Sequence, residues 1–295
     1  MSPELGGQAL VRLFTTPRRH PRPAREAAVL ARGRRFTVDV PLRSPRSRGA
    51  HAEVVAWRWG VGPTVLLVHG WEGRGSQLGC VVEPLLDAGL SVVAFDAPGH
   101  GDSPGNRLLL TDLADVIAAV ADAAGPLHAV VAHSFGGAGV LLAHARRELS
   151  AARLVLVAPN GLVDLAIDSF STTLALGADE RAAFVTRLEA DSGVSLDDLG
   201  LRALVAGGGA SMLIVHDEDD REIPLAAGVA VATAWPGARL RRTVGLGHRR
   251  ILRDPDVLAG ITAFVADGVA RPSGDLAAAL GAGWADRIDL GAFTE

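Results

Sequence analysis

The residue types that could do chemistry in this chain are a serine, a group of carboxylates and a histidine. Ser134 follows an apolar stretch and precedes two glycines after Phe135, an acidic cluster spans residues 217–220, and His248 ends the sequence Gly-Leu-Gly-His. A serine hydroxyl is a weak nucleophile at neutral pH, so it needs a neighbouring base, and histidine has a pKa that suits this role. The base in turn needs a carboxylate to fix its tautomer and stabilise its charged form. These types together indicate nucleophilic catalysis, if the fold brings them together.

The segment around Ser134 predicts a strand, a sharp turn and a helix. Residues 127–133 form an apolar run typical of a strand, and residues 138–148 have helical apolar spacing. In the motif A-x-S-x-G, the small residues Ala132 and Gly136 let the strand and the helix pass close together. The first N–H groups of the helix would stabilise negative charge that develops beside the serine. The structural alternative is that Ser134 only caps this helix.

Strand patterns alternate with helical patterns through most of the chain. Buried strands are predicted at residues 64–68, 91–95, 127–133, 153–158 and 211–216, and a further short strand at 239–244. Helical spacing covers residues 76–88, 108–124, 138–148, 225–234 and 255–267. Residues 36–40 and 54–59 alternate as half-buried antiparallel strands do. This order predicts an α/β fold, a mostly parallel twisted sheet with helices on both faces and chemistry at the carboxyl ends of its strands.

Three segments fall outside this alternation. Residues 1–50 hold eleven arginines, three acidic residues and several prolines, so we expect a basic N-terminal arm lying on a domain of residues 51–268. Docking of the arm on an anionic partner is the alternative; as a mere extension, residues 1–30 would be dispensable for catalysis. Residues 160–209 have helical spacing and are expected either to cap the strand ends or to pack on themselves. Residues 269–295 are poorly patterned, and we expect a loose tail.

The composition narrows the classes of partner and compartment. A net charge of −4 argues against nucleic acid as the main partner. With Cys80 as its one cysteine, the chain can form no internal disulfide, which is compatible with a reducing compartment. No apolar stretch is long enough to span a membrane, and the first residues lack the pattern of a secretory signal. We therefore expect a cytoplasmic globular protein whose oligomeric state the sequence leaves open.

The order of these motifs resembles that of serine hydrolases with the α/β-hydrolase fold, such as esterases, lipases and thioesterases. In that family the catalytic triad runs serine, acid, histidine along the chain, and the resemblance covers residues 50–268. It implies that Ser134 is the nucleophile and His248 the general base. A serine at this position, rather than an aspartate, argues against the dehalogenase and epoxide-hydrolase branches, which need a carboxylate nucleophile.

The acidic cluster supplies the third member of the implied triad. The family's loop is approximately G-x-x-D-x-x-x-P, and residues 217–224 align Asp220 with the catalytic aspartate. Asp217 then stands where the family usually has glycine. Asp219 is the nearest alternative acid, and Asp164, after an earlier strand, is a distant one. A solvated acidic loop without a catalytic role is the structural alternative.

The glycine-rich loop at residues 69–75 resembles the family's oxyanion loop, H-G-x. The resemblance implies that the backbone N–H groups of Trp71 and Phe135 bind the oxyanion. Residues 96–103 match the family's D-x-x-G-x-G-x-S turn, for which we expect a structural role.

Four further residues are candidates for the substrate pocket: His69, Gly70, Arg74 and His133. We expect the two histidines to brace the loops on which they lie rather than to transfer protons. Arg74 could pair with an acidic group of a substrate or be a surface charge. A metal site would need several ligands that converge, and we predict none.

The resemblance implies hydrolysis of a small-molecule acyl ester or thioester through an acyl-enzyme intermediate, without a cofactor. Transfer of the acyl group to an alcohol on the same triad is a second possibility that the residues do not separate from hydrolysis. A non-catalytic protein that binds a ligand or partner in the same pocket is a third. The substrate itself is beyond the sequence, because the cap and the pocket side chains set specificity.

Overall fold

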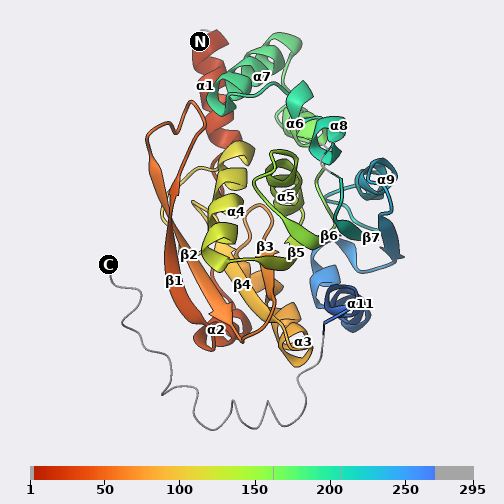
Figure 1. The fold of residues 1–295 in the computed structure, drawn as a ribbon. Coiled ribbons are helices and arrows are strands. Elements are labelled where there is room, and N and C mark those ends of the chain that lie inside the picture. The colour runs from red at the N-terminus through yellow and green to blue at the C-terminus, as the bar shows by residue number, and fades with distance from the viewer. Residues whose placement is uncertain (1–2, 162, 207, 270–295) are drawn as a thin grey trace, which may run out of the picture.

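A sheet of eight strands forms the centre of the molecule (Figure 1), in a computed structural model that describes residues 3–161, 163–206 and 208–269. The strands are β1 (Arg34–Pro41), β2 (His51–Trp59), β3 (Thr64–Val68), β4 (Ser91–Asp96), β5 (Leu127–His133), β6 (Ala151–Val157), β7 (Ser211–Asp217) and β8 (Arg239–Thr243). Their order across the sheet is β1-β2-β4-β3-β5-β6-β7-β8. β1, β2 and β4 pair antiparallel, and all other neighbours pair parallel. The predicted α/β fold with a mostly parallel sheet is confirmed.

Helices cover both faces of this sheet. The helices of the described chain are α1 (Pro3–Phe14), α2 (Ala24–Ala31), α3 (Val82–Asp87), α4 (Leu110–Ala124), α5 (Phe135–Ala145), α6 (Val163–Thr173), α7 (Ala178–Ser192), α8 (Leu201–Val205), α9 (Leu225–Ala234), α10 (Gly247–Arg250) and α11 (Pro255–Ala266). Short 3₁₀ helices lie at η1 (Gly75–Val81), η2 (Asp197–Leu199) and η3 (Ile251–Arg253). Every residue of β3 and β4 is buried, because their apolar side chains meet helices on either side.

Two hydrophobic clusters hold the layers together. On one face, α4, α5 and α9 contribute Ile117, Leu141 and Val231, all fully buried with the sheet. On the other face, α3 and α11 contribute Leu85 and Ile261. Figure 1 shows α4 and α5 in front of the strands. Burial of whole apolar side chains on both faces fixes the strand ends in space, and these ends carry the candidate residues.

Between β6 and β7, the described residues form α6, α7, η2 and α8, as the helical spacing there predicts. A third cluster joins these helices to the N-terminus: the ring of Phe14 lies 5.0 Å from that of Phe170 and 5.3 Å from that of Phe184. Figure 1 shows α1 beside α7 at one end of the molecule. The N-terminal helix therefore packs on the helices inserted between β6 and β7.

The segment expected as an arm, residues 1–50, carries more regular structure than its prolines and arginines indicate. It contains α1, α2 and the edge strand β1, which pairs with β2 from Arg34 to Pro41. Residues 270–295, which make up nearly all of the expected tail, lie outside the described residues. In the part of the chain that the structure describes, no helix has both the length and the apolar character that crossing a membrane requires.

Candidate active site

Ser134 occupies a sharp turn between β5 and α5. Its φ of 52° and ψ of −123° are unusual for a residue with a side chain, and its hydroxyl makes no capping bond to the helix. Capping by the Ser134 side chain, the structural alternative from the sequence, is therefore wrong. A Cβ at Gly136 would lie 2.5 Å from the carbonyl oxygen of His69, so only glycine allows β3 and α5 to approach this closely.

His248 and Asp220 form a hydrogen-bonded pair on neighbouring strand ends. The imidazole Nδ1 lies 2.7 Å from Asp220 Oδ2, and both side chains are buried. The other carboxylate oxygen, Oδ1, accepts hydrogen bonds from the N–H groups of Glu222 and Ile223, each at 2.9 Å. Burial acts to raise the pKa of Asp220, but the bonds from His248 and these N–H groups outweigh it and lower the pKa below its usual value. The carboxylate is thus ionised and aimed at the imidazole.

The other candidate acids have different positions. Asp219 Oδ2 accepts a hydrogen bond from the N–H of Gly245 at 2.9 Å, and Asp164 is exposed in the first turn of α6. The fully buried Asp217 accepts from Thr243 Oγ1 at 2.7 Å. It also accepts from three backbone N–H groups, those of Asp219, Leu246 and Gly247. Asp217 therefore ties the loop that precedes His248 to the end of β7, a role that the sequence did not predict.

His133 braces His248 from the side of β5. Its Nε2–H donates to the carbonyl oxygen of His248 at 3.0 Å, and the two rings lie 4.6 Å apart. Burial, followed by the nearby His248, lowers the pKa of His133 to about 3. His133 is therefore neutral at physiological pH. Because it directly precedes Ser134 in the chain, its bond connects the turn that carries Ser134 to His248.

The loop at residues 69–75 lies against the turn that carries Ser134. A Cβ at Gly70 would be 3.0 Å from the Cβ of Ser134. The ring of Trp71 meets that of Phe135 edge to face at 5.5 Å. The N–H groups of Trp71 and Phe135 have no hydrogen-bond acceptor among the described residues. Two donors beside the serine are thus free to bind another group.

His69 serves the loop rather than the cavity. Its Nδ1–H donates to the carbonyl oxygen of Gly70 at 2.7 Å, and its Nε2 accepts from the N–H of Ala97 at 2.9 Å. Burial lowers the pKa of His69 to about 4, so the ring is neutral. Since both nitrogens are bonded and the side chain is absent from the cavity wall, the expectation of His69 as a pocket residue is corrected to that of a brace.

A cavity of about 1620 Å³ opens over these residues. Ser134 and His248, each 8% exposed, both line it, as do Gly70, Trp71 and His133. Further parts of its wall come from α1, α4, α6 and the residues after α7. The segment between β6 and β7 therefore borders the same space as the candidate catalytic residues.

Arg74 and Asn160 differ from what the sequence predicts. Arg74 reaches the cavity wall, but it is only 5% exposed and its guanidinium is bound by Glu26, with Nε 2.6 Å from Oε2. It is neither a surface charge nor free for an acidic substrate. Asn160, for which the sequence predicts no role, donates its N–H to the carbonyl oxygen of Ser134 at 3.2 Å and lines the cavity. Its place just after β6 was the available signal.

Among the residues that the structure describes, no three His, Cys, Asp or Glu side chains are grouped so that they could hold a metal ion. The carboxylates near His248 instead accept hydrogen bonds from the backbone and from Thr243. The polar groups of this site are thus organised around the histidine and the strand ends.

Comparison with known proteins identifies the family to which this chain belongs. The model of the alpha/beta hydrolase family matches residues 65–261. The chain is 30% identical over 240 residues to a pimeloyl-[acyl-carrier protein] methyl ester esterase of Aromatoleum aromaticum, an alignment that covers 66% of this chain and 94% of the relative.

Solved structures share the fold at lower identity. Rv0554 from Mycobacterium tuberculosis superposes with a TM-score of 0.64 at 20% identity, over 79% of this chain and 99% of that one. The esterase RhEst1 from Rhodococcus gives a TM-score of 0.57 at 20% identity, over 79% and 98% of the two chains. Ser134 lies at a sharp turn between a strand and a helix, and the family model matches two thirds of the chain. The chain therefore belongs to the alpha/beta hydrolase family and resembles its esterases.

Proposed function

We propose that the protein is a serine hydrolase that cleaves a carboxylic ester or thioester of a small molecule. Ser134 attacks the carbonyl carbon while His248 takes the hydroxyl proton, and the resulting oxyanion is bound by the N–H groups of Trp71 and Phe135. His248 then protonates the leaving alcohol or thiol. Water activated by the same imidazole releases the acid and restores the serine.

The observation that carries this proposal is the bond between His248 Nδ1 and Asp220 Oδ2 beside a cavity that Ser134 shares. Because Nδ1–H donates to the carboxylate, the other ring nitrogen, Nε2, is the one left to accept a proton. Asp220 keeps the imidazole in that tautomer and stabilises its charged form. These are the roles that an otherwise weak serine nucleophile requires.

The size of the cavity supports an acyl group of more than a few carbons. The wall contains Leu109, Val163, Phe170 and Leu196 as well as the catalytic side chains, so an apolar chain would gain free energy by leaving water. The relative from Aromatoleum aromaticum is named for a methyl ester, which favours an ester over a thioester within the proposed class. The exposed, unpaired Cys80 fits the cytoplasm, which we propose as the location.

A series of p-nitrophenyl esters from acetate to laurate tests the proposal. We expect hydrolysis by the wild type with kcat/KM rising with chain length, and a loss of at least about 10³-fold in kcat for Ser134→Ala. Ser76→Ala is not a suitable control because Ser76 bonds to Glu26, whereas Ser150 is exposed and does not line the cavity: Ser150→Ala should keep full activity.

The same assay separates the competing readings of the site. Added alcohol would divert product from acid to ester if the protein were an acyltransferase. Wild-type protein that hydrolyses none of the esters, while binding them in the cavity, would contradict the proposal and favour a ligand-binding role.

A further inference from the structure

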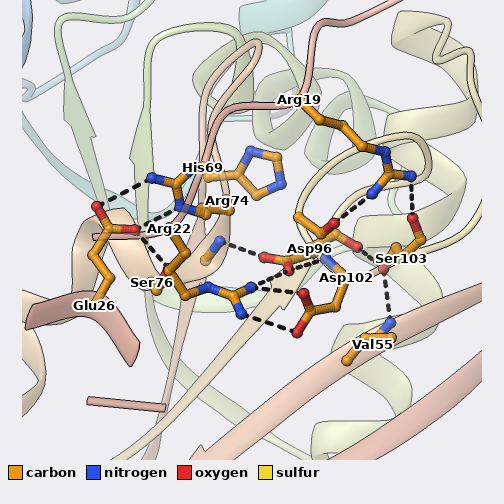
Figure 2. A network of polar contacts seen from close by, with 12 residues as sticks. Arg19, Arg22, Glu26, Val55, His69, Arg74, Ser76, Asp96, Asp102 and Ser103 are labelled. Atoms are coloured by element: carbon orange, nitrogen blue, oxygen red, sulfur yellow. Dashed lines mark hydrogen bonds and ion pairs between the residues drawn. The ribbon is translucent and has the colours of Figure 1, made fainter. Parts of the chain in front are cut away.

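The segment between α1 and the first turn of α2 contacts the loops that follow β3 and β4. Residues 15–26, here named the N-terminal strap, contact loop 69–75 and the turn at residues 96–103 through side chains that Figure 2 shows converging on both. The proposed mechanism uses none of these contacts. They nevertheless include several ion pairs with residues of the loop that carries the proposed oxyanion donor Trp71 and of the turn beside it.

Arg18 binds the residue directly after Trp71. Its backbone N–H and its Nε each donate to Glu72 Oε1, at 3.1 and 2.9 Å, and its Nη2 donates to Oε2 at 3.3 Å. Burial alone would raise the pKa of Glu72, but the bonds from Arg18 lower it, so this carboxylate is charged. Glu72 has a φ of 54°, in the left-handed region, and its N–H donates to His100 Nε2 at 3.1 Å. The strap thus holds a strained residue next to the proposed oxyanion donor.

Glu26 binds the other end of the loop in a buried network (Figure 2). Its Oε2 accepts from Arg74 Nε at 2.6 Å and from Ser76 Oγ at 2.8 Å. Arg74 Nη1 also donates to the carbonyl oxygen of His20, at 3.1 Å. Side chains of Arg74 and Glu26 are 6% and 9% exposed. A buried charge that loses its partner is strongly destabilising, so the loop cannot leave the strap without cost.

The strap also reaches the neighbouring turn at residues 96–103. Arg22 lies 3.5 Å from Asp96 and 3.0 Å from Asp102, and Asp96 Oδ1 accepts the N–H of Gly75 at 2.7 Å. Arg19 donates to the carbonyl oxygens of residues 101, 103 and 105. One segment therefore joins the loops after β3 and β4, which also meet directly through His69, His100 and the bond between Gly75 and Asp96.

We propose that the N-terminal strap fixes the oxyanion loop, and that Glu26 and Arg18 are positioning residues for the N–H of Trp71. Glu72 and Arg74 are the charged side chains of loop 69–75, and the strap holds both. An oxyanion donor helps only when it points to where charge develops. Loosening the strap therefore weakens binding of the transition state more than binding of the substrate. This inference rests on the proposed function.

The test measures kcat and KM for p-nitrophenyl butyrate in Glu26→Gln and Arg18→Gln. We expect kcat to fall about tenfold in Glu26→Gln and about threefold in Arg18→Gln, with KM within about twofold of the wild type. The inhibition constant of an alkyl boronic acid, which mimics the tetrahedral transition state, should rise by the same factors. Glu26→Asp, which keeps the charge, should restore part of the loss.

Arg32→Gln is the matched control. Arg32 follows α2 and pairs with Glu83 at 2.8 Å on the surface, so its loss should leave kcat unchanged. Values of kcat within about twofold of the wild type in both strap variants would overturn the inference, as would a rise in KM alone. If Glu26→Gln does not fold, Arg18→Gln, whose side chain is 80% exposed, decides the matter. Loss of hydrolysis in Ser134→Ala tests the proposed function separately, so an unaffected strap variant counts against the strap alone.

Discussion

Ser134 and Glu72 both hold backbone angles that cost free energy in a residue with a side chain. Their φ values are 52° and 54°, and such conformations cost about 1–3 kcal/mol each unless the surroundings fix them. The N–H of Ser134 donates to the carbonyl oxygen of Val157 at 3.0 Å, and that of Glu72 donates to His100. Strain of this kind gathers where a side chain or a peptide group must be presented to a ligand, which agrees with the proposed roles of these two positions.

Asp220→Asn tests the role of the acid. An amide in place of the carboxylate would present N–H to Nδ1 of His248 and favour the tautomer that carries its proton on Nε2, which cannot take the proton of Ser134. We expect kcat to fall about 10³- to 10⁴-fold with little change in KM, measured on p-nitrophenyl butyrate.

Asp219→Asn is the matched comparison for this prediction. Asp219 Oδ2 accepts one N–H, from Gly245, and an amide oxygen can take over that bond. We expect at most about a tenfold loss of kcat, because the imidazole keeps its partner. A larger loss in Asp219→Asn than in Asp220→Asn would show that the acid has been assigned to the wrong residue.

The elements that carry the site are strands whose ends meet at one edge of the sheet, but the loops after β7 and β8 need a tie of their own. Asp217 supplies it, as the last residue of β7, through bonds to Thr243, Leu246 and Gly247. The bonds from Thr243 and the loop N–H groups more than offset its burial, and the pKa of Asp217 lies below its usual value. The carboxylate of Asp217 therefore stays charged, and both of its oxygens can accept hydrogen bonds.

Asp217→Ala should loosen the loop that holds His248. It leaves three partly buried N–H groups and the hydroxyl of Thr243 without their acceptor, so we expect the free energy of unfolding in urea to fall by about 1–3 kcal/mol. The kcat on esters should fall about tenfold because the imidazole is less well placed. Glu218→Ala, at the next residue and exposed, is the control and should change neither quantity. Equal stability of the two variants would contradict this role for Asp217.

Local sequence patterns predicted the overall α/β fold correctly because the buried strands are short continuous apolar runs. Residues 225–234 are a helix with the bounds that their spacing predicts, and Ser134 and His248 come at strand ends as expected. His248 itself lies on a short helix, α10, where a loop was expected. Four residues give too little periodicity to reveal a helix.

What local patterns could not reveal are contacts between distant parts of the chain. Arg74 and Glu26 are 48 residues apart, and Arg18 and Glu72 are 54 apart. In a segment as rich in arginine as residues 1–50, composition predicts a solvated surface. Only the fold pairs these charges, so the burial of Arg74 and the contacts of residues 15–26 with loop 69–75 had no signal in the sequence.

Labelling by a fluorophosphonate tests the central claim, that Ser134 is an activated nucleophile, without any knowledge of the substrate. Intact-mass measurement should show one phosphonyl adduct on the wild type, and peptide mapping should place it on the peptide that contains Ser134. We expect labelling to be slowed at least about 10²-fold in His248→Ala, because the serine loses its base. An adduct on another residue, or equal labelling of wild type and Ser134→Ala, would contradict the account.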